Sequence, residues 1–438
     1  KGYDKGRLMH TSTMAESAKR AEQALARLAA LHPKLIDLGL ERSFALLRKL
    51  GDPHLRLPPT IHVAGTNGKG SVIAFLRALA EAGGVTTHVY SSPHLCRFNE
   101  RIRLAGTLID DAALADLLEE VEALNGTQQV TFFEVTTAAA MLAFSRHPAD
   151  LLCLETGLGG ALDSTNVLTA PLATIITPIA RDHEHFLGTS LTGIAEQKAG
   201  IMRSGIPCFS AAQSSEVAAT LQTCADKIGA PLYMAGRDFV ISPQPDGGGC
   251  LTVSGTTTYF PRPGLAGPHQ IDNAGLAFMA LSSTGACAPD GITKATWPGR
   301  VQQLDKGTLA TIWPYQPIWL DGAHNAHGAT ALAATLRTIH DGRWNVICGA
   351  LNTRDPAEFL APLSSLAGHV ACLTIPDQDA SLSATAMSDA AKKLGMTASP
   401  AKTLAAAFDQ LDQNAPVIIC GSLYLVGHIL WQNKTLPA

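Results

Sequence analysis

Short apolar runs alternate with amphipathic segments along the first part of the chain. The apolar runs favour buried strands and occupy residues 60–64, 87–91, 150–155 and 172–177. Apolar residues at helical spacing predict helices over residues 15–30, 43–50, 110–124 and 131–147. Strands that alternate with helices in this way indicate an α/β fold with a mainly parallel sheet.

The connection between the first strand and the next helix is rich in glycine. Residues 65–71 read Gly-Thr-Asn-Gly-Lys-Gly-Ser, and apolar residues at helical spacing follow from Val72 to Leu79. A strand, a glycine loop and a helix together present backbone N–H groups and a helix N-terminus to phosphate. We expect Lys69 to reach the β- and γ-phosphates, and Ser71 to cap the helix and stand near a magnesium ion.

This loop departs from the strict phosphate-loop pattern at two positions. Val63 stands where that pattern has its first glycine, and Gly70 follows Lys69 where the pattern has Ser or Thr. The alternative is a glycine-rich connection that binds nothing. Three glycines around one lysine at the end of a buried strand favour phosphate binding, because packing alone does not require them.

Polar residues follow the later strands of this part. Ser91 to Leu95 follow the second strand, and Glu155 ends the third, before a glycine-rich loop over residues 157–166. A carboxylate at a strand end beside such a loop is a candidate magnesium ligand, although a strand-end Glu is usually only solvated. In the run from Asp182 to His185, neighbouring side chains cannot all face one ion, so one histidine contact is expected.

Two further cationic features have both a functional and an ordinary interpretation. Lys198 lies on an otherwise apolar helical face, where a lysine commonly extends its ammonium group to solvent. Residues 97–103 carry three arginines in a segment that we interpret as a loop. They could hold a polyanion or form a solvated surface.

The last third of the chain repeats the alternation of strands and helices. Residues 231–260 predict a small accessory sheet, and Pro298 and Gly299 indicate a linker. Beyond it we predict strands over residues 308–313, 317–320, 344–348, 370–375 and 417–420, and helices over residues 327–339, 357–366, 384–394 and 423–430. We therefore predict an ATP-binding domain over residues 14–297 and a doubly wound, Rossmann-like α/β domain over residues 298–438.

Composition limits the function classes. The 438 residues are 46% hydrophobic with a formal net charge of −4, so no basic surface for nucleic acid is indicated. We find no apolar run of membrane-spanning length and no signal peptide, and nine cysteines without paired spacing indicate reduced thiols in the cytoplasm rather than a zinc site. Residues 1–13 are polar and aperiodic, so we expect an expression remnant or disorder there, with Met14 a candidate native start.

The sequence of the glycine loop resembles the ATP loop of the folylpolyglutamate synthase/dihydrofolate synthase family, whose members are relatives of the peptidoglycan Mur ligases. Further family-like segments follow in order. They are Ser-Pro-His-Leu at 92–95, Glu155 with Gly-Leu-Gly-Gly-x-Leu-Asp-x-Thr-Asn at 157–166, Asp-His-x-x-x-Leu-Gly at 182–188, Lys-Ala-Gly-Ile at 198–201, His-Gln-x-x-Asn-Ala at 269–274, Pro-Gly-Arg at 298–300, Asp-Gly-Ala-His-Asn at 321–325 and Gly-Ser-Leu-Tyr-Leu at 421–425. Each is weak alone, but nine in order are specific.

The resemblance implies an ATP-dependent ligase with a P-loop-type ATPase domain. It would join L-glutamate to dihydropteroate and to folate glutamyl tails through an acyl phosphate, as a bifunctional cytoplasmic enzyme that we expect to be a monomer. Monofunctional folylpolyglutamate synthase, another Mur-type ligase and a non-catalytic ATP-binding module remain alternatives. The cofactors implied are ATP, two Mg²⁺ ions and a carbamylated Lys198.

The resemblance also implies site residues. The ATP group is Gly65, Thr66, Asn67, Gly68, Lys69, Gly70, Ser71, His269, Asn273, Arg300 and Asp321. The metal group is Ser92, Glu155 and His183, and the catalytic group is Lys69, His183, Lys198, Arg300, Asp321 and His324. The pterin or folate group is Gly39, Leu40, Arg42, Thr131, Phe133 and Asp163.

Overall fold

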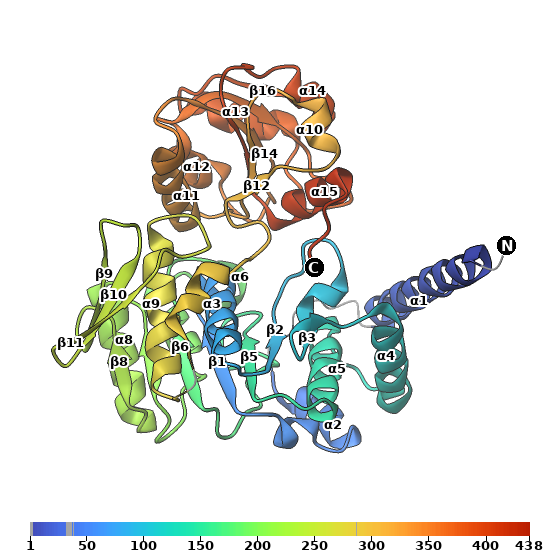
Figure 1. Cartoon of the computed structure of the whole chain (residues 1–438), viewed down its shortest axis with the longest axis vertical. Coiled ribbons are helices and arrows are strands. Elements are labelled where there is room, and N and C mark those ends of the chain that lie inside the picture. The colour runs from blue at the N-terminus through green and yellow to red at the C-terminus, as the bar shows by residue number, and fades with distance from the viewer. Residues whose placement is uncertain (1–2, 32–36, 38, 286) are drawn as a thin grey trace.

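The computed structural model contains two α/β bodies stacked along the long axis of the molecule (Figure 1). It describes residues 3–31, 37, 39–285 and 287–438. One body contains an eight-stranded sheet and a small three-stranded sheet, and the other contains a six-stranded sheet. The α/β class and the mainly parallel first sheet predicted from the sequence are confirmed.

The eight-stranded sheet has the order β4-β3-β2-β5-β1-β6-β7-β8. Its strands are β1 (Thr60–Ala64), β2 (Thr87–Tyr90), β3 (Ile102–Leu104), β4 (Thr107–Leu108), β5 (Leu151–Glu155), β6 (Ala173–Ile176), β7 (Cys208–Ser210) and β8 (Leu232–Met234). All neighbours pair in parallel except those that involve β3 and β4. β1 and β5 are central and buried along their whole length, as expected of apolar strands covered on both faces.

Helices cover both faces of this sheet. They are α1 (Tyr3–Leu31), α2 (Glu41–Lys49), α3 (Lys69–Ala82), α4 (Asp111–Asn125), α5 (Phe132–Arg146), α6 (Glu184–Leu187), α7 (Leu191–Ala199), α8 (Ser215–Ile228) and α9 (His269–Ser282), with short 3₁₀ turns at Pro53–Arg56, Phe98–Arg101 and Pro289–Lys294. One apolar core joins α3 and α9 to the sheet, and a second core on the other face joins α1, α2, α4 and α5 to it.

Three expectations for this body need correction. α1 begins at Tyr3, so residues 3–13 continue the first helix instead of being disordered. Residues 97–103 form a 3₁₀ turn and β3 instead of a loop. Only β9 (Phe239–Pro243), β10 (Gly249–Val253) and β11 (Thr256–Phe260) form the accessory antiparallel sheet, because β8 pairs with β7 in the main sheet.

The six-stranded sheet has the order β12-β13-β17-β14-β15-β16, and only β12 is antiparallel. Its strands are β12 (Gln302–Leu304), β13 (Ile318–Leu320), β14 (Trp344–Cys348), β15 (Ala367–Cys372), β16 (Ala398–Pro400) and β17 (Val417–Cys420). Its helices are α10 (Thr308–Ile312), α11 (Ala326–Ile339), α12 (Pro356–Leu360), α13 (Ala384–Lys393), α14 (Leu404–Phe408) and α15 (Leu423–Asn433), with a 3₁₀ turn at Ala361–Leu363.

The strand predicted over residues 308–313 is wrong, because this segment is α10. Leu309 and Trp313 are both buried and lie four positions apart, which is helical spacing. β12, β16 and α14 were not predicted, and the strand expected over residues 370–375 begins earlier, at Ala367. No helix among the described residues is long and apolar enough to cross a membrane.

Candidate functional site

The glycine loop connects β1 to α3 and is held in shape by its own backbone. Gly65 has φ 147° and Gly68 has φ 91°, a region that disfavours other residues. A Cβ on Gly65 would lie 1.8 Å from Thr177 Oγ1, so a side chain cannot fit there. Thr66 Oγ1 donates to Ala180 O at 3.0 Å and accepts from Ala180 N at 3.1 Å, which fixes the loop against the segment after β6.

Ser71 does not cap α3 as expected. The N-cap is Gly68, and Ser71 lies buried in the first helical turn, where Oγ accepts a hydrogen bond from Gln270 Nε2 at 3.3 Å. Gly70 is required by packing, because a Cβ there would lie 2.7 Å from Trp297 Nε1. The helix N-terminus is therefore free of a side-chain cap, and its N–H groups are available to an anion.

One half-buried lysine and one buried lysine converge on a single backbone carbonyl of this loop. Lys69 Nζ lies 3.2 Å from Gly65 O, and Lys198 Nζ lies 2.8 Å from the same oxygen. Burial lowers the pKa of Lys69, an effect that the carboxylate of Glu155 opposes. Burial and the charge of Lys69 lower the pKa of Lys198 well below its ordinary value. Two cations this close favour an anion at this point.

Glu155 lies at the end of β5 and is 5% exposed. Ser92 donates its backbone N–H to Glu155 Oε2 at 3.3 Å, and among the described residues no hydrogen bond to Oε1 is found. Burial raises the pKa of Glu155, while nearby Lys69 opposes the rise. A strand-end carboxylate with one oxygen left free of donors suits a hard cation.

His183 lies near Lys69 and Lys198 and has a left-handed backbone conformation, with φ 52°. Burial and the positive charges of Lys69, His324 and Lys198 lower its pKa to about 4, so the imidazole is neutral near pH 7 and has a free lone pair. In the described part of the chain no three His, Cys, Asp or Glu side chains are grouped to hold a metal. Glu155 alone still suits Mg²⁺, which usually takes one or two protein carboxylates and completes its shell with phosphate and water. His183 as a second ligand stays a prediction.

The N-terminal end of α9 lies against the glycine loop. A Cβ on Gly68 would lie 2.8 Å from Asn273 Oδ1, and Asn273 Nδ2 donates to Gln270 Oε1 at 3.0 Å. Burial, then the charges of Arg300 and His327, lower the pKa of His269 to about 4. The structure therefore brings Asn273 to the glycine loop, and His269 begins the same helix.

The carboxyl edge of the six-stranded sheet faces this loop. Asp321 follows β13 and accepts from Val301 N at 2.9 Å and Ala323 N at 2.8 Å, which ties the linker to the strand end. His324 Nδ1 contacts Gly322 O at 2.7 Å, so Nδ1 carries the proton and Nε2 keeps its lone pair. Burial lowers the pKa of His324 and raises that of Asp321, and Arg300 lies close to both.

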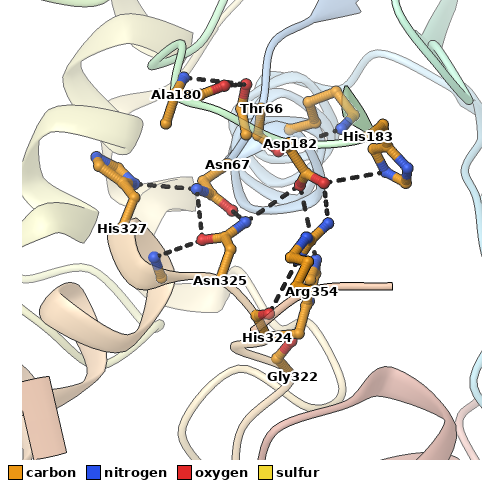
Figure 2. Close-up of polar contacts among 12 residues, drawn as sticks. Thr66, Asn67, Ala180, Asp182, His183, Gly322, His324, Asn325, His327 and Arg354 are labelled. Carbon is orange, nitrogen blue, oxygen red and sulfur yellow. Dashed lines mark hydrogen bonds and ion pairs between the residues drawn. The ribbon is translucent and has the colours of Figure 1, made fainter. Parts of the chain in front are cut away.

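Five polar side chains connect the two bodies at this point (Figure 2). Asn67 Nδ2 lies 3.2 Å from Asn325 Oδ1 and 3.0 Å from His327 Nδ1. Asn325 Nδ2 donates to Asp182 Oδ2 at 3.1 Å, and Arg354 pairs with Asp182 Oδ1. Sequence reasoning did not assign roles to Asp182, Asn325, His327 or Arg354. Arg354 lies in the loop that follows β14, and this position after a predicted strand is the sequence feature that could have identified it.

The residues assigned to the pterin form a separate group around the start of α5. Thr131 and Glu134 form a capping box there, and Arg42 Nε donates to Glu134 Oε1 at 3.1 Å. Phe133 packs on the glycine loop after β5, because a Cβ on Gly157 would lie 2.3 Å from its ring. Gly39 and Leu40 lead into α2 beside this group, whereas Ile36 and Leu38 lie outside the described residues.

Asp163 is 2% exposed and bonds within its own loop. It accepts hydrogen bonds from Leu158 N at 2.7 Å and from Thr165 N at 3.0 Å, and it also accepts one from the Thr165 hydroxyl. Burial raises the pKa of Asp163, and these hydrogen bonds oppose the rise. In this structure Asp163 shapes the glycine loop on which Phe133 rests.

A glycine loop beside two lysines, a strand-end carboxylate and a second α/β body that reaches across to this loop fit an ATP-dependent ligase. The chain belongs to the dihydrofolate synthase/folylpolyglutamate synthase family. A family model described as "Dihydrofolate synthetase, C-terminal domain" matches residues 313–432. The Bacillus subtilis dihydrofolate synthase/folylpolyglutamate synthase is 33% identical over 414 residues, 89% of this chain and 94% of the relative.

Solved structures agree over nearly the whole chain. Escherichia coli FolC in complex with DHPP and ADP has a TM-score of 0.82 and 31% identity, and the match covers 94% of this chain and 97% of that one. A bifunctional folylpolyglutamate synthase/dihydrofolate synthase with Mn, AMPPNP and L-glutamate bound has a TM-score of 0.82 and 29% identity, with 93% and 97% covered.

Proposed function

We propose that this chain catalyses the ATP-dependent addition of L-glutamate to dihydropteroate and to folate glutamyl tails. The observation that carries the proposal is the convergence of Lys69, Lys198 and Glu155 at a glycine loop that faces the edge bearing Asp321 and His324. This arrangement supports phosphate binding at the loop and the approach of a second reactant from the opposite edge.

The reaction has two steps. A carboxylate oxygen of the acceptor attacks the γ-phosphorus of ATP, which gives an acyl phosphate and ADP. The amino group of glutamate then attacks the acyl carbon, phosphate leaves with the former carboxylate oxygen, and the ammonium proton passes to a base. Lys69 and the N–H groups at the start of α3 stabilise the charge on the transferred phosphoryl group.

Magnesium, when bound, neutralises phosphate charge and orients the transferred group. Glu155 and His183 would hold it, beside the Ser92 segment that positions Glu155. Manganese with AMPPNP in a structural neighbour supports a divalent cation and a nucleotide here. Two ions and the role of Ser92 as a ligand belong to this proposal.

Carbamylation of Lys198 is part of the same proposal. Its amine reacts with CO₂ only in the neutral form, and the lowered pKa makes that form accessible. The carbamate would convert a second buried cation into an anion beside Lys69, which removes the repulsion between the two lysines.

The acceptor, the domain limits and the state of the protein are proposed on the same basis. We assign Phe133 and the Gly39–Arg42 segment to the pterin, residues 14–297 to ATP binding and residues 298–438 to the second domain. We also propose a cytoplasmic monomer. The nine cysteines are all free thiols, which supports a reducing compartment.

The test is phosphate release with ATP, Mg²⁺ and L-glutamate, with dihydropteroate and a reduced monoglutamyl folate compared as acceptors. Turnover with both acceptors supports the bifunctional enzyme. Turnover with the folate alone indicates a monofunctional folylpolyglutamate synthase and removes the assignment of dihydropteroate. Turnover only with a UDP-muramyl substrate, or none at all, overturns the proposal in favour of a Mur ligase or a non-catalytic ATP-binding module.

A further inference from the structure

The loop after β14 sends Arg354 across to the other α/β body. Arg354 pairs with Asp182 Oδ1, and its Nη1 donates to the backbone oxygen of His324 at 2.9 Å. The side chain of Asp182 is 6% exposed and that of Arg354 is 24% exposed, so solvent screens this pair less than a surface pair. One guanidinium thus contacts both the segment beside His183 and the segment that carries His324 (Figure 2).

Asn325 completes the connection from the same edge. Its Nδ2 donates to Asp182 Oδ2 at 3.1 Å and to Asn67 Oδ1 at 3.2 Å, and its Oδ1 accepts from Gly328 N at 2.8 Å at the start of α11. Both carboxylate oxygens of Asp182 are therefore bonded to the C-terminal body. Asn325 is rigid because it also caps a helix, and it reaches Asn67 inside the phosphate loop.

The opposite side of the boundary is held by packing instead. A Cβ on Gly427 of α15 would lie 1.9 Å from Leu95 O, and Leu95 and Cys96 pack against the core of the C-terminal body. Cys96 Sγ lies 3.3 Å from Gly427 O. These contacts are independent of Arg354, so the two bodies remain joined when the polar side is weakened.

We propose that Arg354 is a positioning residue that acts through Asp182 and Asn325. It sets the spacing between the phosphate loop and the His324 segment, and thereby the approach of the glutamate amine to the acyl phosphate. The effect on the approach of glutamate rests on the proposed function. The effect on the spacing of the two segments rests on the contacts alone.

The experiment compares Arg354→Gln, Arg354→Lys and Asp182→Asn with Arg337→Gln as the control. Arg337 is an exposed arginine of α11 that bonds Ser365 Oγ in the same body. For Arg354→Gln we expect kcat/KM for glutamate to fall by about tenfold or more, since a small misplacement of reactants is costly. Affinity for AMPPNP should change by less than about threefold, because the phosphate-binding groups stay in place.

Arg354→Lys should recover part of the loss, because a lysine keeps the charge but makes fewer directed bonds. Arg354→Gln combined with Asp182→Asn should be no worse than the more impaired single variant, because both changes remove one interaction. A merely structural role would lower the melting temperature without recovery in Arg354→Lys and without non-additive losses in the double variant. Additive losses, or a glutamate kcat/KM within about twofold of the parent, would overturn the proposal.

Hydrogen exchange separates this inference from the proposed function. In the nucleotide-free protein, Arg354→Gln should speed exchange of the amides over residues 322–328, and Arg337→Gln should leave them unchanged. If the parent shows no glutamate-dependent phosphate release, the proposed function fails while this result still decides the positioning role. Unchanged exchange in Arg354→Gln would contradict that role whatever the reaction is.

Discussion

The carboxyl edges of the two parallel sheets differ in where their polar side chains find partners. At the first edge, buried Lys198 and Glu155 and half-buried Lys69 contact backbone groups of their own body. At the second edge, Asp321 and His324 also contact backbone groups of their own body, but Asn325 and Arg354 bond to side chains of the other body. Both edges follow the same rule, that the ends of parallel strands collect polar loops. We propose that the first edge holds phosphate and that the second positions the reactant that approaches it.

Lys69→Ala should have the largest effect, because it removes the lysine of the first edge that we assign to the transferred phosphoryl group. We expect glutamate-dependent phosphate release to fall by roughly 10²–10³-fold. Lys227→Ala, on the exposed end of α8, is the matched control. A loss of less than about tenfold would show that the loop amides suffice and would weaken the contrast between the edges.

Lys198→Ala should have the second largest effect. We expect turnover to fall by about 10²-fold and ATP affinity to fall by less. Because burial lowers the pKa of Lys198, its neutral amine exists at lower pH than that of an ordinary lysine. Carbamate formation should therefore increase with pH through this lowered pKa.

The parent enzyme should lose activity after CO₂ removal and regain it with bicarbonate, whereas Lys198→Ala should not respond. Electron density that extends beyond Nζ in a bicarbonate-soaked crystal would identify the adduct. A bare amine at Lys198 under those conditions, in a fully active enzyme, would contradict the carbamylation of Lys198.

His324→Ala tests the second edge. We expect kcat/KM for glutamate to fall by about 10–10²-fold, with AMPPNP affinity nearly unchanged, because His324 follows β13 and lies opposite the phosphate loop. His428→Ala is a suitable control, because His428 bonds only Gln432 on the outer face of α15 among the described residues. Equal losses of nucleotide and glutamate binding would mean that the two edges do not divide their tasks.

Phe133→Leu should have the smallest effect, because it removes only ring contact at the start of α5. We expect KM for the pterin-bearing acceptor to rise by about threefold to tenfold, with KM for ATP and for glutamate unchanged. Tyr259→Leu, at a ring that is 67% exposed on β11, controls for the loss of an aromatic side chain. A change in KM for ATP alone would contradict the assignment of Phe133 to the acceptor site.

Local patterns in the sequence were enough for the central strands and for the first edge. β1, β5, β14 and β17 are buried on both faces, so their apolar runs are unambiguous. The β-branched residues of α10 suggested a strand, and only the burial of Leu309 and Trp313 shows the helix. Short edge strands such as β16 carry no comparable signal.

Lys69 and Glu155 could be predicted because each is attached to a recognisable loop. The cap expected from Ser71 failed, because the positive φ of Gly68 ends the loop three residues earlier. Asp182 and Arg354 lie 172 positions apart, and no periodicity or spacing connects them. Contacts of this kind depend on how two bodies pack, which one chain's pattern does not encode.

The central claim is that the phosphate loop activates a carboxylate of the acceptor for attack by glutamate. The most direct measurement uses dihydropteroate labelled with ¹⁸O in its carboxylate and follows the label by mass spectrometry of the released phosphate. Transfer of one labelled oxygen to each phosphate, in step with amide formation, is the predicted result. Phosphate without label would contradict the acyl phosphate and, with it, the role assigned to the glycine loop.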